Sequence, residues 1–290
     1  MSDIGNTSQF LNLTRDSYLE RTSRPIYAVI FLMPLIIFYE MGAIWLNPDT
    51  LSQSQVRVVA FLWLQNFLEY VGFNNKSIWI ASPLAVIVIL LALQIVSRKQ
   101  WHFWFGDIVP MIGECILLAI PLIVLSLLLN CSAEQRDTKQ YVGTASLTNC
   151  IVCNTTAVHP QDGQSRTEKL LANIVTGIGA GIYEELVFRL ILICLLMMLF
   201  QDILRLNRNT SVSASVLISA ALFSAHHHVI FLNGQFGQTS PFNGTEFVFR
   251  TIAGVYFAIL FAVRGFGITA GVHAFYDTMA VLINAVFFER

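Results

Sequence analysis

The sequence predicts an all-α fold, a polytopic membrane helix bundle of about seven to eight transmembrane helices. Of its 290 residues, 55% are hydrophobic and only 12% are charged, whereas soluble domains carry about 25% charged residues. The mean hydropathy is +0.64, and the apolar residues form long runs with few or no charges, as in chains that lipid solvates. These runs are continuously apolar and do not alternate with a period of two, which favours helices over a closed barrel.

Most apolar runs have the length of a membrane span, about 20 residues. They cover residues 25–46, 78–97, 109–130, 212–232, 247–264 and 267–288. A weaker run at 56–73 contains polar residues, so we expect it to lie in the interface or to pack inside the bundle. The run at 170–200 would measure about 46 Å as a helix, against a hydrocarbon core of about 30 Å, so we expect it to break or tilt.

The polar stretches divide the chain into four segments. These are a polar N-terminal segment (1–24), N-terminal transmembrane helices (25–130), a polar loop (131–168) and a second group of membrane helices (169–290). No cleavage site of small residues follows the first apolar run, so we expect that run to remain as a membrane anchor. Basic clusters near residues 15–24, 98–99 and 205–208 favour a cytoplasmic N-terminus and an external loop.

The charge of the chain bears on nucleic-acid binding, and its cysteines bear on disulfides and metal binding. The net charge is −1 and no basic cluster suggests nucleic-acid binding, so none is expected. Cys131, Cys150 and Cys153 fall in the polar loop, where a disulfide or half of a metal site are both open. No second CxxC or nearby histidine pair accompanies them, which disfavours zinc there.

The first candidate site residues lie near the middle of the longest run. An ionisable group inside a membrane helix costs several kcal/mol unless it is paired or hydrated, so it is a functional candidate. Glu185 and Arg189 are four residues apart in the order that favours an intrahelical ion pair, so we expect them to give structural support. Glu184 then projects about 100° away and is available for chemistry. Gly177 and Gly181 form a small-xxx-small stripe that lets a neighbouring helix approach.

Histidines supply the other candidates. His226, His227 and His228 end an apolar run. Consecutive residues on a helix point in different directions, so we expect one or two of these imidazoles to face an aqueous edge or lipid headgroups. His273 and Asp277 are four residues apart, on one helical face, where the carboxylate can orient the imidazole or share a ligand with it.

Together these groups suit the activation of water. A glutamate and a histidine can jointly deprotonate a water molecule, and further imidazoles can stabilise an oxyanion. The same groups could instead supply two histidines and a carboxylate to a divalent metal that activates the water. The residues alone leave both chemistries open.

In order and spacing, these motifs resemble the CPBP intramembrane peptidases. That family includes the type II CAAX prenyl endopeptidases of the Rce1 kind and the bacterial Abi proteins, described as bacteriocin-processing and immunity proteins. Its pattern is EExxxR, FxxxH and HxxxN or HxxxD, on separate membrane helices. Here the pattern is Glu184-Glu185-x-x-x-Arg189, Phe223-x-x-x-His227 and His273-x-x-x-Asp277. The resemblance covers roughly residues 168–288 and implies a peptidase core over 169–290.

The resemblance implies an intramembrane endopeptidase that cleaves a membrane-associated protein or peptide. By position, Glu184 matches the general base on water and His227 matches its partner. His273 and Asp277 match the pair that stabilises the oxyanion, which completes the expected catalytic set. Family mechanisms are described both with and without a metal. The cofactor is therefore either a divalent metal such as zinc, bound by Glu184, His227 and His273, or none.

The chain departs from the family pattern at three positions. Leu190 stands where glycine is usual, so the helix break after the first motif is expected to be absent or shifted. Ser224 also replaces a common glycine, which can alter how neighbouring helices approach. Asp277 replaces the more frequent asparagine, and an ionised aspartate cannot donate a hydrogen bond to an oxyanion. Asp277 must therefore be protonated, orient His273 or bind metal.

Two other functions remain open. One is a non-catalytic immunity or partner protein that retains the fold, although the intact motifs disfavour it. The other is a small carrier with Glu40, Glu69 and Glu114 as relay residues, although no paired half-helix repeats are visible. For every alternative we expect a multi-pass protein of the cell membrane, the inner membrane of a bacterium, in contact with the lipid bilayer.

Overall fold

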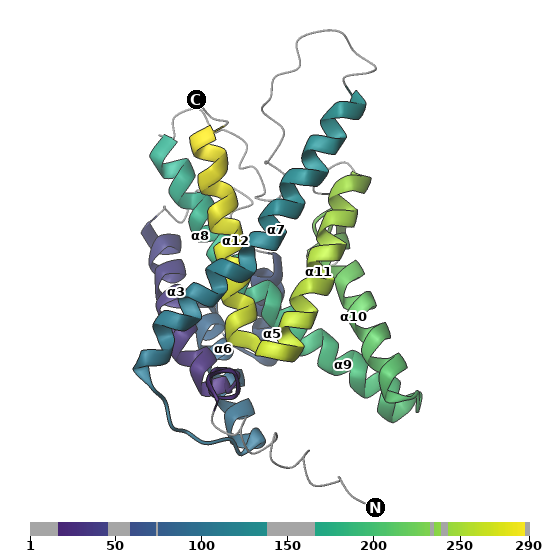
Figure 1. The fold of residues 1–290 in the computed structure, drawn as a ribbon. Coiled ribbons are helices and arrows are strands. Elements are labelled where there is room, and N and C mark those ends of the chain that lie inside the picture. Colours follow the sequence, from purple (N-terminus) through teal and green to yellow (C-terminus); the bar gives the residue numbers. More distant parts are fainter. Residues whose placement is uncertain are drawn as a thin grey trace, which may run out of the picture.

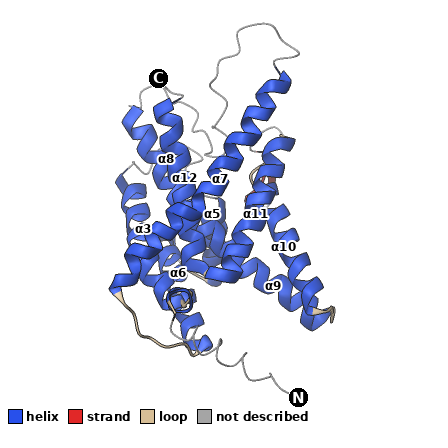
Figure 2. Ribbon diagram, viewed as in Figure 1, coloured by secondary structure: helices blue, strands red, loops and turns tan. Residues whose placement is uncertain are grey.

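The computed structural model describes residues 17–45, 59–73, 75–137, 166–232, 235–238 and 243–287. Within these ranges the chain is a bundle of helices with one short hairpin (Figures 1 and 2). The predicted all-α, polytopic architecture is confirmed. The helices of the first half are α2 (Tyr18–Thr22), α3 (Pro25–Trp45), α5 (Val59–Val71), α6 (Asn75–Ser97) and α7 (Ile108–Asp137), with a 3-10 turn at Phe105–Asp107.

The second half contains the helices that carry the candidate residues. They are α8 (Arg166–Glu185), the π-helical stretch η3 (Leu186–Leu192), α9 (Ile193–Met198), a second π-helical stretch η4 (Leu199–Ile203), α10 (Arg208–Ala225), α11 (Gly244–Arg264) and α12 (Phe266–Phe287). The strands β1 (Val229–Leu232) and β2 (Gln235–Gln238) lie between α10 and α11.

Six stretches of the described residues are long and apolar enough to cross a membrane. They are Pro25–Trp45, Ile80–Ser97, Phe105–Leu129, Arg166–Ile203, Gly244–Arg264 and Phe266–Val286. The predicted total of about seven to eight included the 56–73 and 212–232 runs. The first forms α5, which has only 13 residues. The second forms α10, whose 18 residues end at Ala225, so the expected continuation to residue 232 is wrong.

The early end of α10 has a local cause. Val229–Leu232 is rich in β-branched and aromatic residues, which pack well in strands. It is followed in the sequence by Asn233-Gly234, the dipeptide that most strongly favours a two-residue hairpin connection. The chain therefore leaves the helix and pairs β1 with β2 in antiparallel fashion.

The long run at 170–200 is helical throughout and does not break. The candidate span from Arg166 to Ile203 has 38 residues. In Figure 1 its α8 part lies at the upper left and its α9 part at the lower right, so the segment crosses the bundle obliquely. The two π-helical stretches interrupt the regular α-helical pattern without ending the helix.

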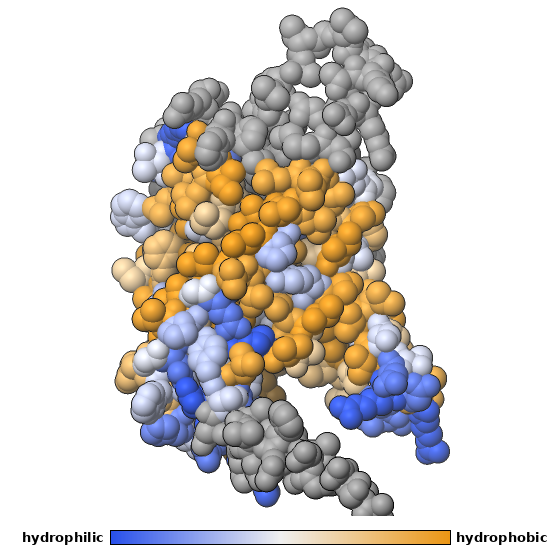
Figure 3. All heavy atoms as spheres, in the orientation of Figure 1, coloured by the Kyte–Doolittle hydropathy of each residue, from blue (hydrophilic) through white to orange (hydrophobic). Residues whose placement is uncertain are grey.

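Many large hydrophobic side chains lie on the outer surface, as is typical of a protein in contact with lipid. Large hydrophobic side chains such as Ile44, Val96, Leu117 and Val263 are mostly exposed. Figure 3 shows a broad hydrophobic belt across this face, with hydrophilic residues gathered at its lower end. An apolar surface of this extent on a bundle with six candidate spans is typical of a protein embedded in a bilayer.

The centre of the bundle is α12. In the 18-residue apolar window of its span, 67% of the residues are buried, against 22–39% in the windows of the other candidate spans. Gly181 of α8 explains how closely α8 packs on it, since a Cβ atom there would lie 2.4 Å from the backbone nitrogen of Ala274. At Gly177 a Cβ atom would lie 2.8 Å from that of Asp277. The predicted close approach at the glycine stripe is thus confirmed, and it brings the α8 motif against the α12 motif.

Candidate functional site

The first part of the site is a buried ionic chain from α8 to α12. The carboxylate of Glu185 lies 3.1 Å from Nε of Arg189, so the predicted ion pair is confirmed. Its other oxygen lies 2.7 Å from Nδ1 of His273. Both Glu185 and Arg189 are fully buried, and the guanidinium also lies 4.1 Å from the ring centre of Phe223 on α10. Glu185 therefore compensates a buried cation and also orients an imidazole on another helix.

Glu184 is the carboxylate that faces the histidines. It is buried, with Oε1 3.4 Å from Nε2 of His226 and Oε2 4.0 Å from Nε2 of His273. Within the described part of the chain, Oε2 has no hydrogen-bond partner. A buried carboxylate oxygen without a partner is costly in a structural role, and it is the arrangement that a water-activating base requires.

The histidine run lies in a turn and not on a helix. Since α10 ends at Ala225, the 100° rule for successive helical residues does not apply to residues 226–228. Nδ1 of His226 lies 2.5 Å from the carbonyl oxygen of Phe223, and Nδ1 of His227 lies 2.9 Å from Nε2 of His226. The imidazoles of His226 and His227 are therefore neighbours.

The structure leaves one of the three histidines partly exposed, within the expected one or two. His226 and His228 are buried, and only His227 is partly exposed. His228 is directed away from Glu184, with Nε2 3.5 Å from a guanidinium nitrogen of Arg250 on α11. The sequence analysis named His226 but did not predict that it contacts Glu184. The available signal was the hairpin dipeptide Asn233-Gly234, which indicates that the helix ends before the histidines.

Hydrogen-bond direction makes the Glu184–His226 contact informative. The Nδ1 atom of His226 faces a carbonyl oxygen and must donate to it. In a neutral imidazole, Nε2 would then present a lone pair to the Glu184 carboxylate. Nε2 of His226 also lies 2.9 Å from Nδ1 of His227, which is closer than the Glu184 oxygen at 3.4 Å. An N–H donated by His227 therefore satisfies that lone pair.

His273 and Asp277 lie on one face of α12, as predicted. Nε2 of His273 is 3.5 Å from a carboxylate oxygen of Asp277, and the imidazole stacks on Phe257 with ring centres 4.5 Å apart. Because Nδ1 faces the Glu185 carboxylate, Nε2 is directed towards Glu184 and Asp277. Asp277 therefore has the position to orient His273, one of the three roles left open for it.

The other two departures from the family pattern have structural consequences. Leu190 lies inside the π-helical stretch η3, so the helix continues past Arg189 and the break is absent there, as expected. The hydroxyl of Ser224 donates to the carbonyl oxygen of Phe247 at 2.7 Å. That bond joins the end of α10 to α11 next to the histidine turn.

One group among the described residues has the donor geometry for a metal ion. Ligand atoms of Glu184, His226 and His227 lie within 4.8 Å of one another. Two imidazoles and a carboxylate suit zinc. The group differs from the predicted ligand set because His226 takes the place of His273.

The remaining ionisable residues of interest lie outside this cluster. Glu40 accepts a hydrogen bond from Tyr183 at 3.2 Å. Glu114 is paired with Arg264 and accepts from Tyr18, while Glu69 is exposed. These three carboxylates are separate in their contacts and form no relay chain among the described residues. Cys150 and Cys153 lie outside the described residues, as does the side chain of Cys131.

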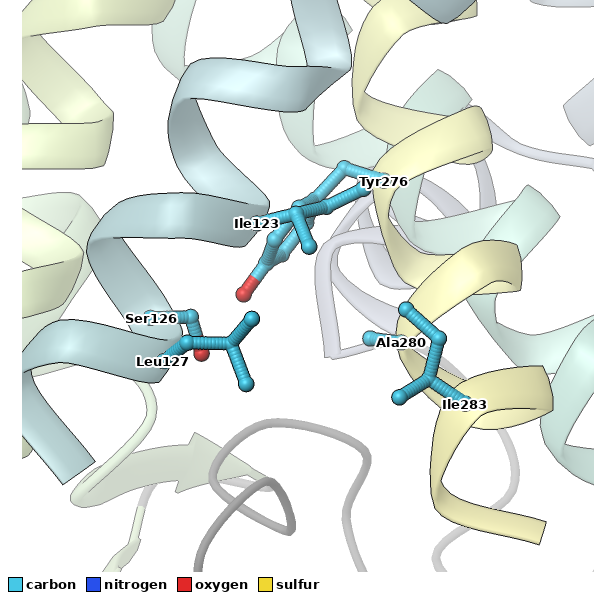
Figure 4. Close-up of a pocket in the computed structure, with 6 residues that line it drawn as sticks. All are labelled: Ile123, Ser126, Leu127, Tyr276, Ala280 and Ile283. Carbon is cyan, nitrogen blue, oxygen red and sulfur yellow. The ribbon is translucent and has the colours of Figure 1, made fainter. Parts of the chain in front are cut away.

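A small pocket lies between α7 and α12 (Figure 4). Figure 4 shows the hydroxyl of Tyr276 directed from α12 towards the Ser126 side of the pocket. Its lining residues are Ile123, Ser126, Leu127, Tyr276, Ala280 and Ile283. None of the candidate catalytic residues is among them, so this pocket is not the site.

The fold and the cluster define a polytopic membrane protein with a buried glutamate–histidine site. Residues 166–279 match the model of the family described as Type II CAAX prenyl endopeptidase Rce1-like. The match contains all three motifs, so the resemblance inferred from them is confirmed for this part of the chain. No curated protein and no solved structure matches the chain.

Proposed function

We propose that this chain is an intramembrane endopeptidase that hydrolyses a peptide bond of a membrane-associated protein or peptide. The observation that carries the proposal is the position of Glu184. Its carboxylate is buried, has one oxygen without a hydrogen-bond partner among the described residues and lies next to His226 and His273. The match to a family of endopeptidases supports the same chemistry.

In the proposed reaction, Glu184 removes a proton from a water molecule, and the resulting hydroxide attacks the scissile carbonyl carbon. The carbonyl oxygen becomes an oxyanion, which Nε2–H of protonated His273 stabilises. The carboxylates of Glu185 and Asp277 lie 2.7 Å and 3.5 Å from its two ring nitrogens and orient the imidazole. The proton on Glu184 then passes to the leaving amine as the C–N bond breaks.

The histidine turn has its own role in this scheme. His226 and His227 lie beside Glu184 and orient the carboxylate and the water. The same three residues would hold a divalent metal ion, which would supply a Lewis acid that makes bound water more acidic. The roles assigned to Glu185 and Arg189 are supporting ones with or without a metal.

The proposal includes the setting of the enzyme. We assign the peptidase core to residues 169–290 and place the chain in the cell membrane, the inner membrane of a bacterium, with residues 1–24 on the cytoplasmic side. Its partners would be the lipid bilayer and a peptide or protein substrate. Within the described residues, the basic clusters at the start of α3, the end of α6 and the α9–α10 connection support this orientation.

Cleavage assays on matched variants test the proposal. Purified wild-type protein in detergent micelles would be incubated with a library of quenched fluorescent octapeptides with randomised apolar positions. We expect Glu184→Gln to abolish cleavage, since an amide cannot take the proton. Glu69→Gln, at an exposed carboxylate, is the matched control and should retain wild-type activity.

Cleavage by purified Glu184→Gln at the wild-type rate would refute the water-activating role. If the wild-type protein cleaves no peptide, the non-catalytic alternative is favoured instead. A carrier would instead lose transport on replacement of Glu40, Glu69 or Glu114, with Glu184 unimportant.

A further inference from the structure

The β1–β2 hairpin directly follows the histidine turn of the candidate site. His228 closes the histidine turn, and β1 starts at the next residue, Val229. In the part of the chain that the structure describes, β1 pairs with β2 alone, with Val229 opposite Gln238 and Leu232 opposite Gln235. Among the described residues, the strands contact chiefly each other, and neither packs extensively on a helix. The outer edge of β1 is therefore continuous with the candidate site.

The register determines which backbone groups that edge presents. Residues along an antiparallel pair alternate between those bonded to the partner strand and those directed away from it. Two residues separate the strands, so Leu232 and Gln235 form the bonded pair that closes the hairpin. Val229 and Phe231 then direct their backbone N–H and C=O groups away from β2. Such groups need partners, and a second peptide in extended conformation supplies them.

The contacts of the preceding turn place the hairpin near one end of the bundle. The end of α10 and the histidine turn each contact the beginning of α11, through Ser224 to Phe247 at 2.7 Å and through His228 to Arg250 at 3.5 Å. These contacts lie in the first two turns of α11, which begins at Gly244. β1 therefore joins that end of the bundle to the turn whose His226 lies 3.4 Å from Glu184.

We propose that the outer edge of β1 binds the peptide substrate as an added strand, with Val229 and Phe231 forming the backbone hydrogen bonds. The inference rests on the proposed peptidase function and deepens it by naming the substrate class. Strand addition recognises the main chain of an extended segment. An intact helix uses its own backbone groups internally and cannot pair in this way. The substrate class is thus an extended or locally unwound segment, and not a regular transmembrane helix.

Backbone methylation of a substrate tests this directly without changing the protein. One octapeptide that the wild-type protein cleaves would be taken from the randomised library and N-methylated at one backbone position at a time. In an added strand, alternate residues face β1, so kcat/KM should fall at least about tenfold at every second position on one side of the scissile bond. Methylation at the intervening positions should change kcat/KM less than about threefold.

Variants of the strand provide the reciprocal test. Phe231→Pro removes the outward N–H, whereas Phe231→Ala keeps it and also lacks the ring, so the two form a matched pair. We expect kcat/KM of the proline variant to be at least about tenfold below that of the alanine variant, mainly through KM. The matched pair on the other strand is Phe236→Pro and Phe236→Ala, whose kcat/KM values should agree within about threefold.

The outcomes separate the two proposals. Peptide cleavage that shows no two-residue period and no difference between Phe231→Pro and Phe231→Ala would overturn strand addition and leave the peptidase proposal standing. A loss confined to the Phe236 pair would also overturn it, since the proposal commits to β1. If no library peptide is cleaved, both proposals fail.

Discussion

Nδ1 of His273 lies 2.7 Å from the carboxylate of Glu185, a contact between residues 88 positions apart in the chain. This contact joins α12 to α8 at the level of the candidate site. It also determines the tautomer of His273, because the nitrogen that faces Glu185 must carry a proton. Since Glu185 pairs with Arg189 as well, the charge balance of the bundle core and the orientation of the imidazole depend on the same carboxylate.

The Glu185–Arg189 pair should show strong coupling. Arg189→Met leaves a carboxylate without its compensating cation in a fully buried position, and we expect it to lower the free energy of unfolding by about 3–5 kcal/mol. The double variant Glu185→Gln/Arg189→Met should be more stable than Arg189→Met alone. Thermal unfolding in detergent measures both effects.

The control is Arg208→Met, at an exposed position, which should change stability by less than about 0.5 kcal/mol. If the losses of the Glu185→Gln and Arg189→Met variants simply add in the double variant, the two residues are not coupled.

The contact between α8 and α12 should not tolerate a side chain at Gly181. A Cβ atom there would lie 2.4 Å from the backbone of Ala274, next to His273. Gly181→Ala should therefore cost about 1–3 kcal/mol of stability and lower peptidase activity, because α12 must move away. Gly113→Ala is the matched control in α7, where an added Cβ atom meets nothing within 4 Å. Equal melting temperatures for the two variants would show that the packing is looser than described.

Replacing either of two serines on α10 by alanine should change the stability of the protein in opposite directions. The hydroxyl of Ser219 donates to the carbonyl oxygen of Phe188 in η3 at 2.7 Å, whereas the buried hydroxyl of Ser215 has no partner among the described residues. Ser219→Ala should destabilise the protein by about 1 kcal/mol. Ser215→Ala should be neutral or slightly stabilising, since it removes an unsatisfied polar group. The two thermal unfolding curves, compared with wild type, decide whether Ser219 stabilises the π-helical stretch.

Metal binding should depend on His226 more than on His273. Zinc titration of purified protein, followed by calorimetry, tests the donor set Glu184, His226 and His227. We expect His226→Ala to weaken zinc binding at least tenfold, as the loss of one ligand does, and His273→Ala to leave it within about threefold. A stronger effect of His273→Ala would restore the ligand set expected from the sequence. A wild-type protein that binds no zinc would favour the metal-free reaction.

Much of this site followed from local patterns. The spacing of Glu185 and Arg189 predicted their ion pair, that of His273 and Asp277 predicted a shared face, and the glycine stripe predicted a close helix contact. Each of these depends on the geometry of one helix, which repeats every 3.6 residues. Reasoning of this kind failed at His226, because helical periodicity was extended past Ala225, where the helix ends.

Other features had no local signal. The π-helical geometry around Arg189 reflects packing against neighbouring helices, including the bond from Ser219, and no spacing in the sequence reports it. The partners of Glu184 come from the turn after α10 and from α12, and their distances depend on how three helices pack.

Hydropathy and run length were enough to predict a membrane-embedded helical protein, because they decide whether a segment is solvated by lipid or by water. The positions of ionisable residues within the apolar runs also predicted which side chains could act in catalysis. The packing of the helices decides which carboxylate faces the histidines, which histidine lies beside it and where the adjacent strand edge begins. Those properties arise from contacts between residues far apart in the chain, whose close packing no local pattern specifies.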